Sequence, residues 1–322
     1  MSPISYRHQP VHSMAALGRA LGETVETLTL LAANADQLYR LAKPIPKDDG
    51  TFRRPFDAIE PLKPLHRRIK DRLFSGVEFP TYMTGSLRGT DYRVNARLHL
   101  GSKIVICEDV EKFFPSTTSS QVKSIWTGVF GFSEDVADCL TKLTTKNGFL
   151  PEGAITSSYL ANLTFWRDES VLVEEFGSYG LTYSRYVDDI TVSSKTVIDN
   201  ATKEMIIAKI YGMLRKNGYS AKRRKHEIKS GKDRMAVTKL TVNKSLGTTK
   251  SSKHRVRAAL HQLEQKIKAG DFDAEIMKQI SSIEGRINNF ASFHPGEANA
   301  MKHRLQTAKS LAQSHPLNSE PA

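Results

Sequence analysis

Two short runs of β-prone residues flank a pair of acids in the second half of the chain. The run 181–186 alternates apolar and polar positions, and the run 190–194 is rich in β-branched residues. Between them lie Val187, Asp188 and Asp189. This pattern predicts a β-hairpin that carries two carboxylates on its tip. Aspartate is also common in solvated turns for backbone reasons, so the hairpin alone does not establish a functional site.

A further acid follows a second apolar run earlier in the chain. The segment 104–107 is apolar and β-branched, and it leads directly into Glu108 and Asp109. Such a segment predicts a strand that delivers an acid at its carboxyl end. Phe113 and Phe114 come next. These rings either wall a pocket or fill the core, which is the usual place for aromatic side chains.

Carboxylates gathered from two such strands repel each other unless a cation lies among them. Magnesium suits this cluster, because hard cations take oxygen ligands and leave positions for phosphates and water. Two such ions activate an attacking hydroxyl and stabilise the leaving oxygen in a phosphoryl displacement. The acids therefore predict a nucleotidyltransferase site with two Mg²⁺ ions. The alternative is a set of unrelated surface acids.

Periodic apolar positions in the first quarter of the chain predict helices. Leucines recur at helical spacing over 14–41, and prolines at 44 and 46 stop the pattern. A turn is predicted at 47–50, followed by a basic amphipathic helix over 62–74. The apolar stripes of these helices are expected to pack into a core.

Helices are also predicted around the acidic hairpin. A loop at 148–153 has glycine at both ends, and Thr156 or Ser157 is expected to cap the helix that follows. The segment 200–217 reads as another helix, closed by Gly218. Strands and helices mixed in this order indicate an α+β fold.

From Ser251 onward the pattern is mainly helical. Apolar residues recur at three and four over 256–267 and again over 276–287. This predicts a small helical bundle, plausibly a separate subdomain, with a frayed tail at 316–322.

The charge balance points to a polyanionic partner. Lys and Arg number 47 against 34 Asp and Glu, a net charge of +13, and a basic surface attracts nucleic-acid phosphates. The densest basic runs lie at 53–72 and 222–234, where a solvated helical face is the alternative interpretation.

The composition also bears on location. Cys107 and Cys139 are too few for a disulfide framework or a zinc site and are expected to stay reduced. No apolar run approaches the length that spans a bilayer, and the first residues lack a signal-peptide core. We expect a cytoplasmic protein without a membrane partner.

In their order along the chain, these motifs resemble those of reverse transcriptases, and bacterial retron reverse transcriptases in particular. The segment 108–116 is similar to the first acidic motif of the family, 150–162 to its Leu-Pro-Gln-Gly-Ala-Pro-Thr-Ser-Pro motif, and 186–189 to its acidic hairpin. The retron signature Asn-Ala-x-x-His is matched at 95–99, and 237–240 stands where the family has Val-Thr-Gly-Leu. The resemblance covers about residues 24–290.

The resemblance implies roles for individual residues. Asp109, Asp188 and Asp189 are the expected catalytic acids, and Asp109, Asp188 and the carbonyl of Val110 bind magnesium with Asp189 assisting. The expected nucleotide-binding residues are Arg53, Phe114, Glu152, Gly153 and Lys225. Phe114 acts as the gate that excludes a 2′-hydroxyl, while Arg53 and Lys225 approach the triphosphate. RNA contacts are expected at Asn95, His99, Val237, Thr238, Asn243 and Arg257.

Several of these residues also have a purely structural or surface interpretation. Asn95 and His99 are equally well explained as structural polar groups. For Arg53 and Lys225 the alternative is a solvated surface cation, and Arg54 leaves the register of Arg53 open.

The chain departs from the family pattern at several positions. Glu152 replaces a glutamine and places a carboxylate near the incoming nucleotide. Ile155 and Ser158 replace prolines, which is expected to loosen the loop, and Lys239 replaces a glycine.

The resemblance implies a right-hand polymerase. Fingers are expected over 1–100 with a helical insertion at 116–150, a palm with an antiparallel sheet over 101–115 and 151–250, and a helical thumb and tail over 251–322. We expect no RNase H or endonuclease domain after the thumb.

Retron function implies a specific set of partners. The enzyme is expected to copy a cognate structured non-coding RNA, which serves as template and primer, into a branched RNA–DNA molecule (msDNA). Its substrates are deoxynucleoside triphosphates, and it grips an RNA–DNA hybrid. The resemblance further implies antiviral defence with a separate effector protein, and template removal by a host ribonuclease H.

Two other functions fit the same motifs. A group II intron or diversity-generating reverse transcriptase would share the acidic motifs but not the stretch at 95–99. A catalytically silent RNA-binding scaffold would share the basic charge, but the presence of all three acids disfavours it.

Overall fold

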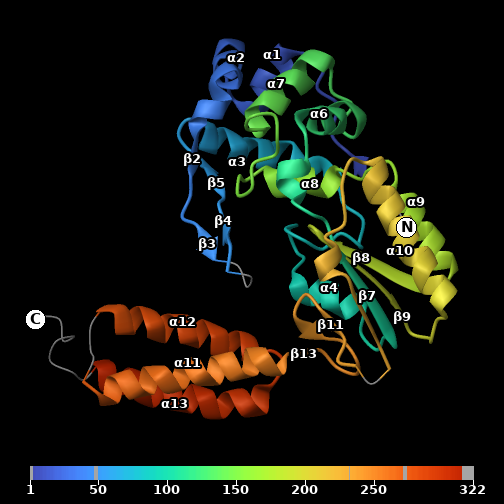
Figure 1. Cartoon of the computed structure of the whole chain (residues 1–322). Helices are drawn as coiled ribbons and strands as arrows, with labels where there is room; N and C mark the ends of the chain where they lie inside the picture. Colours follow the sequence, from blue (N-terminus) through green and yellow to red (C-terminus); the bar gives the residue numbers. More distant parts are fainter. Residues whose placement is uncertain (1–2, 47–49, 232, 271–273, 314–322) are drawn as a thin grey trace, which may run out of the picture. The chain divides into compact units, whose positions relative to one another are not determined.

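The computed structural model describes residues 3–46, 50–231, 233–270 and 274–313 (Figure 1). The predicted tail at 316–322 and residues 47–49 of the predicted turn lie outside the described residues. Contacts within the described part divide the chain into two compact units, and the boundary along the sequence lies between Asp233 and Arg234.

Helices make up much of the first unit. They are α1 (Met14–Leu21), α2 (Val25–Asn34), α3 (Leu62–Arg72), α4 (Tyr92–Leu98), α5 (Phe113–Ser116), α6 (Ser119–Gly128), α7 (Glu134–Thr144), α8 (Ser157–Leu163), α9 (Glu169–Ser178) and α10 (Asn200–Lys216), with 3₁₀ turns η1 (Ala35–Leu38), η2 (Phe74–Gly76) and η3 (Arg223–Lys225). The strands are β1 (Ser5–Tyr6), β2 (Tyr39–Leu41), β3 (Ile45–Pro46), β4 (Phe52–Arg53), β5 (Phe56–Ala58), β6 (Val77–Glu78), β7 (Ile104–Asp109), β8 (Leu181–Tyr186), β9 (Asp189–Ser194) and β10 (Glu227–Ser230). The predicted strand at 104–107, the hairpin and the helix over 200–217 are confirmed.

The main sheet of the described residues has four antiparallel strands in the order β10-β7-β9-β8. Side chains alternate between the faces of a strand, so the β7–β9 register places Asp109, Cys107, Asp189 and Thr191 on one face. Figure 1 shows α9 and α10 along the opposite face. The sheet therefore has an apolar face covered by helices and a polar face that carries the acids.

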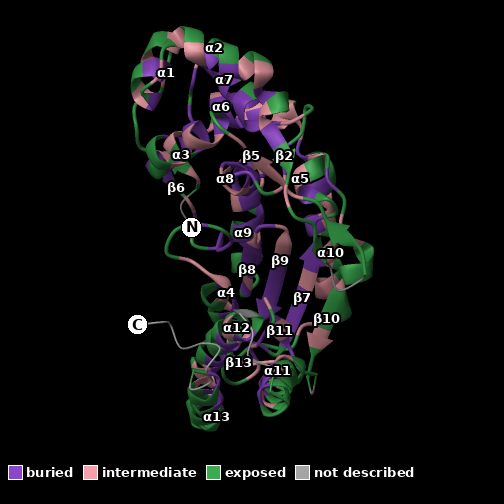
Figure 2. Ribbon diagram, turned by 90° about the vertical axis from the view of Figure 1, so that its left-hand side faces the viewer, coloured by how far each residue is buried: buried purple, intermediate pink, exposed green. Residues whose placement is uncertain are grey.

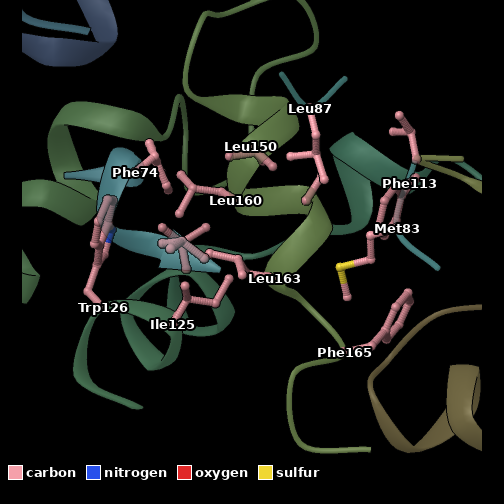
Figure 3. Packing of buried hydrophobic residues seen from close by; sticks show 14 of the residues in the cluster. Phe74, Met83, Leu87, Phe113, Ile125, Trp126, Leu150, Leu160, Leu163 and Phe165 are labelled. Atoms are coloured by element: carbon pink, nitrogen blue, oxygen red, sulfur yellow. The ribbon is translucent and has the colours of Figure 1, made fainter. Parts of the chain in front are cut away.

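A continuous hydrophobic core runs through the first unit and includes side chains from its helices and from β7, β8 and β9. In Figure 3, Leu160 and Leu163 of α8 lie between Trp126 on one side and Phe113 and Phe165 on the other. Each fully buried leucine contributes about 2 kcal/mol. Figure 2 shows β7 and β9 largely buried, so the strands that carry the acids are rigidly held.

The single helix predicted over 14–41 is wrong. The chain forms α1 and α2 instead, then η1 and strand β2. Gly22 adopts φ 68° at the end of α1, and the Thr24 side chain accepts a hydrogen bond from the N–H of Thr27 at the start of α2. A left-handed glycine followed by a capping threonine ends one helix and begins another.

The predicted cap of α8 is wrong in one respect. Thr156 does precede the first turn, but its hydroxyl is buried and has no partner among the described residues. The turn is therefore stabilised by packing of Leu160 and Leu163 rather than by a side-chain cap.

The second unit joins a small sheet to long helices. Its elements are β11 (Ala236–Val237), β12 (Leu240–Thr241), β13 (Gly247–Thr248), α11 (Lys250–Lys268), α12 (Ala274–Ala291) and α13 (Pro295–Gln313). The apolar stripes predicted over 256–267 and 276–287 are buried against α13, which confirms the helical bundle. In the part of the chain that is described, no helix combines the length and apolarity that crossing a membrane requires.

Candidate active site

The acidic hairpin has a short, strained tip. Tyr186 of β8 pairs with Asp189 of β9, which leaves Val187 and Asp188 as the turn. Val187 has φ 61°, a region that a β-branched residue rarely adopts. Strain of this kind costs about 1–3 kcal/mol and persists only where the surroundings impose it.

The acid of β7 meets the hairpin at its tip. Asp109 pairs directly with Asp189 across the two strands, and cross-strand neighbours have Cβ atoms about 5 Å apart. The N–H of Val110 donates to the carbonyl of Asp188 at 3.0 Å. Two strands far apart in sequence thus bring the three predicted catalytic acids together.

The cluster holds more negative charge than its surroundings favour. Burial, followed by the charge of Asp109, raises the pKa of Asp188. Burial, then the charge of Asp188, raises the pKa of Asp189 to about 7, and the Asp189 carboxyl also hydrogen-bonds Asp109. Raised carboxyl pKa values mark a site that lacks compensating positive charge.

Lys225 supplies part of that charge. Its ammonium forms an ion pair with the Asp109 carboxylate, and its side chain remains half exposed. Burial lowers the pKa of Lys225, but the hydrogen bond to Asp109 and the charge of the acids outweigh it, so the pKa is raised. Lys225 is therefore held protonated beside the acids.

The donor set fits magnesium by its chemistry. Asp109, Asp188 and Asp189 present oxygen ligands with excess charge, which hard cations prefer. The ammonium of Lys225 pairs with the Asp109 carboxylate, where a metal ion would bind. Within the described residues, no three His, Cys, Asp or Glu side chains form a complete metal-binding set. The three aspartates thus supply negative charge and oxygen ligands, but not a complete coordination shell.

The segment that carries Lys225 is fixed to the end of β7. The N–H of Lys222 donates to the carbonyl of Asp109 at 2.7 Å. Glu108, next to Asp109, accepts from Nδ1 of His226 at 2.5 Å and from the hydroxyl of Tyr211 at 3.2 Å. The sequence analysis gave no role to Glu108 or His226. The available signal was a second acid next to Asp109 and a histidine next to Lys225.

The predicted nucleotide-binding residues Arg53, Glu152 and Gly153 lie together. Nε of Arg53 is 2.8 Å from Oε1 of Glu152, and the N–H of Phe56 donates to the Glu152 carbonyl at 2.7 Å. Gly153 has φ 104°, and a Cβ there would lie 2.9 Å from Pro55. Arg53 also lowers the pKa of Asp188, although burial and Asp109 prevail. The β4–β5 segment is thus joined to the 150–153 loop near the acids.

The two aromatic residues after Asp109 have different environments. Phe113 is buried and stacks on Phe165 with ring centroids 5.8 Å apart. Phe114 is only half buried. Phe113 therefore belongs to the core, whereas Phe114 retains surface that a nucleotide sugar can contact.

Asn95 and His99, both predicted to contact RNA, have fully buried side chains. Oδ1 of Asn95 accepts from Thr84 at 2.7 Å. The ring nitrogens of His99 bond the hydroxyls of Ser193 and Ser184 at 2.8 and 2.7 Å. Both residues tie α4 and its neighbouring segment to the polar face of the sheet, which is the structural alternative.

The other predicted RNA contacts lie in the second unit. The side chain of Val237 is buried. Thr238 and Lys239 form the β11–β12 turn with φ 46° and 69°, so Lys239 holds a conformation that glycine adopts more easily. Asn243 accepts from the N–H of Met235 at 3.0 Å, and Arg257 is half exposed and pairs with Glu297.

A buried ion pair beneath the hairpin was missed. Arg185 and Glu169 have exposed side-chain fractions of 0% and 1%, with Nε to Oε1 at 2.5 Å. Arginine at an inward position of an otherwise apolar strand face was the signal, since such a residue is almost never buried without a partner.

Comparisons with known proteins agree with these motifs. The chain is 33% identical over 261 residues to the Retron Se72 reverse transcriptase of Salmonella heidelberg, which covers 80% of this chain and 69% of that protein. It is 29% identical over 325 residues to the Retron Ec48 reverse transcriptase of Escherichia coli, covering 96% and 79%. The Retron Ec86 reverse transcriptase of Escherichia coli is 26% identical over 251 residues, covering 77% of each.

Other comparisons add little. No family model matches the chain. A telomerase from Candida tropicalis superposes with a TM-score of 0.46 and 11% identity, covering 70% of this chain and 61% of that one. A telomerase from Candida albicans gives a TM-score of 0.45 and 10% identity, covering 88% and 58%. These scores are too low to support a conclusion.

Proposed function

Because the chain belongs to the retron reverse transcriptases and is an RNA-directed DNA polymerase, we propose that its chemistry takes place at Asp109, Asp188 and Asp189. One observation carries this proposal. Asp109 and Asp189 face each other across two strands, next to Asp188 in the turn. Clustered, partly buried carboxyls with raised pKa values favour a bound cation, and template-directed polymerisation uses divalent cations.

Asp109, Asp188 and the carbonyl of Val110 would hold magnesium, with Asp189 assisting. Two bound ions would supply the charge that activates the primer hydroxyl and stabilises the leaving pyrophosphate. Lys225 would leave Asp109 for the triphosphate, because a half-exposed side chain is free to swing. As an ammonium, Lys225 would have a proton at Nζ to donate to the departing pyrophosphate.

The nucleotide would lie between the acids and the β4–β5 segment. Arg53 would contact the triphosphate, and the bare backbone at Gly153 would allow close approach. The half-buried ring of Phe114 would press against the sugar and exclude a 2′-hydroxyl. Positioning of this kind supplies most of the catalysis in phosphoryl transfer.

The whole chain would follow the right-hand layout. The sheet β10-β7-β9-β8 would be the palm, the N-terminal elements with α6 and α7 the fingers, and α11, α12 and α13 the thumb. The second compact unit begins at Arg234, ahead of the helices, and so also includes β11, β12 and β13.

The family also suggests a biological setting. The product would be a branched RNA–DNA molecule started from a 2′-hydroxyl of a guanosine in a cognate RNA, made from deoxynucleoside triphosphates. A host ribonuclease H would remove template, and a separate effector protein would act with the complex in antiphage defence. Sequencing the nucleic acid that copurifies with the protein tests this setting, and unbranched or unrelated RNA would contradict it.

The catalytic proposal is tested with Asp188→Asn. Purified protein with its copurified RNA, Mg²⁺ and deoxynucleotides is expected to make DNA. Asp188→Asn is expected to lower incorporation by at least about a thousandfold, as loss of a principal charge-stabilising group does. RNA affinity, measured by filter binding, should stay within about twofold because RNA is held mainly by phosphate contacts.

Asp71→Asn is the matched control, since Asp71 is an exposed carboxylate on α3, and it should keep full activity. A wild-type complex that makes no DNA would favour the silent RNA-binding scaffold. Full activity in Asp188→Asn would place the catalytic acids elsewhere.

A further inference from the structure

The buried pair Arg185–Glu169 is joined by two hydrogen bonds. Nε of Arg185 lies 2.5 Å from Oε1 of Glu169, and Nη2 lies 2.8 Å from Oε2. The hydroxyl of Tyr183 adds a third bond to Glu169 at 2.7 Å. Removing two charges from water costs several kcal/mol per ion, so a buried pair is weak evidence for stability. The pair therefore calls for another reason to be present.

The remaining donors of Arg185 reach the acidic turn and α8. Nη1 donates to the carbonyl of Val187 at 3.1 Å, and Nη2 donates to the carbonyl of Asn162 at 2.8 Å. Val187 is the residue with φ 61°. The guanidinium thus donates to the carbonyl of the strained residue Val187, and Glu169 holds the guanidinium in its orientation.

A second clamp holds the same turn from its other side. The backbone of Gly85 packs so closely that a Cβ there would lie 2.4 Å from the nitrogen of Val187. Nδ2 of Asn162 donates to the Gly85 carbonyl at 2.8 Å, and the N–H of Thr84 donates to the Arg185 carbonyl at 3.0 Å. Asn162 therefore links the Gly85 backbone to the Arg185 guanidinium.

The contacts fix the backbone on both sides of the catalytic acid. Arg185 holds the carbonyl of Val187, and Val110 holds the carbonyl of Asp188 at 3.0 Å. With both peptide groups fixed, the Cα–Cβ direction of Asp188 is fixed as well. We propose that Arg185, oriented by Glu169, is a positioning residue that holds the strained turn so that Asp188 points toward Asp109.

This inference rests on the proposed function, since it takes Asp188 as a metal-binding acid. The two are separable by experiment. Loss of DNA synthesis in Asp188→Asn concerns the proposed function alone. Variants at Arg185 and Glu169, which lie outside the acid cluster, test the positioning role: the loss of DNA synthesis in them is compared with the loss in Asp188→Asn.

The first test is Arg185→Lys in the full chain with its RNA. Lysine keeps the positive charge for Glu169 but cannot span both Glu169 and the Val187 carbonyl. We expect kcat to fall about ten- to a hundredfold, because small misplacements of a reacting group cost that much. RNA affinity and the KM for deoxynucleotide should stay within about twofold.

A second readout does not depend on activity. Mn²⁺ raises Tm by binding the folded state, and this rise should shrink in Arg185→Lys toward its value in Asp188→Asn. His66→Gln is the matched control, because His66 is also fully buried with a 2.7 Å bond to a carbonyl but lies away from the turn. It should lower Tm yet leave kcat and the Mn²⁺ effect unchanged.

A triple variant separates positioning from stability. Tyr183→Phe with Arg185→Met and Glu169→Leu replaces the buried polar cluster by apolar groups, which often preserves stability. A folded triple variant with reduced kcat and a reduced Mn²⁺ effect supports the proposal. Wild-type kcat and Mn²⁺ response in either folded variant overturns it. Failure of both variants to fold also overturns it, since the pair would then serve the stability of the unit.

Discussion

At the scale of single residues, Glu152 is the departure from the family pattern that the structure explains best. Its carboxylate pairs with Arg53, the residue expected to bind the triphosphate, and the two side chains are 25% and 48% exposed. An ion pair this exposed contributes only about 0.2–1 kcal/mol. The pair is therefore weak enough for a triphosphate to displace it.

Glu152→Gln tests this competition. Removing the charge should free Arg53 for the triphosphate, so the KM for deoxynucleotide is expected to fall about two- to fivefold with little change in kcat. Single-nucleotide incorporation at varied substrate concentration measures both constants. Glu134→Gln, which removes an exposed carboxylate paired with Lys123, is the control. An increased KM would show that Glu152 assists nucleotide binding instead.

Asn95 and His99 show how far one residue can be interpreted from sequence. Their spacing identified the family correctly, yet both side chains are buried. Burial lowers the pKa of His99 to about 4, so the ring is neutral and bonds serine hydroxyls. The residue types could be read from the sequence. Their partners could not: His99 bonds Ser184 and Ser193, nearly a hundred residues away, and Asn95 accepts from Thr84.

At the scale of elements, the acidic hairpin could be predicted because its signals are local. Alternating positions at 181–186 and the acidic turn specify strand, turn and strand with little help from the rest of the chain. The prediction of one helix over 14–41 was wrong because the local apolar spacing does not show where a helix ends. Both α1 and α2 bury leucines in the same core, so the apolar spacing continues across the break at Gly22.

Gly85→Ala tests how tightly the hairpin is clamped. The new methyl group would lie 2.4 Å from the nitrogen of Val187 and 2.8 Å from the carbonyl carbon of Tyr186, so backbone must shift. We expect the free energy of unfolding to fall by about 1–3 kcal/mol, and DNA synthesis to fall with it. Urea unfolding and primer extension measure the two effects.

The control for this variant is Gly177→Ala in α9, where a Cβ meets nothing within 4 Å. Alanine in a helix should leave stability unchanged or raise it by up to about 1 kcal/mol. Normal stability and activity in Gly85→Ala would mean that the turn tolerates displacement.

At the scale of the whole molecule, the net charge favours a nucleic-acid partner. The excess of 47 basic over 34 acidic residues gives +13. Many of these cations are already paired within the protein, as Lys253 and Arg257 are with Glu297. The net charge still favours a polyanion, because paired charges cancel and leave the excess.

RNA binding is therefore expected to weaken steeply with salt. With about five phosphate contacts, affinity should fall on the order of a hundredfold between about 50 and 200 mM salt, through release of counterions. Filter binding over this range measures the slope, and Tm over the same range controls for salt effects on folding. A slope near zero would show that phosphate contacts do not dominate binding.

The sequence by itself determined the local features: the strand ending in Asp109, the acidic hairpin, the helical stripes at 256–267 and 276–287, and the motifs that identify the family. Each depends on neighbours a few residues apart, where spacing dictates which face a side chain occupies. Only the tertiary structure decided which side chains are buried and which partners they meet. The pairs Arg185–Glu169, Arg53–Glu152 and Lys225–Asp109 join segments distant in sequence. Such pairs form only when folding brings their segments together, and for Arg185–Glu169 burial also leaves each charge no water to bind.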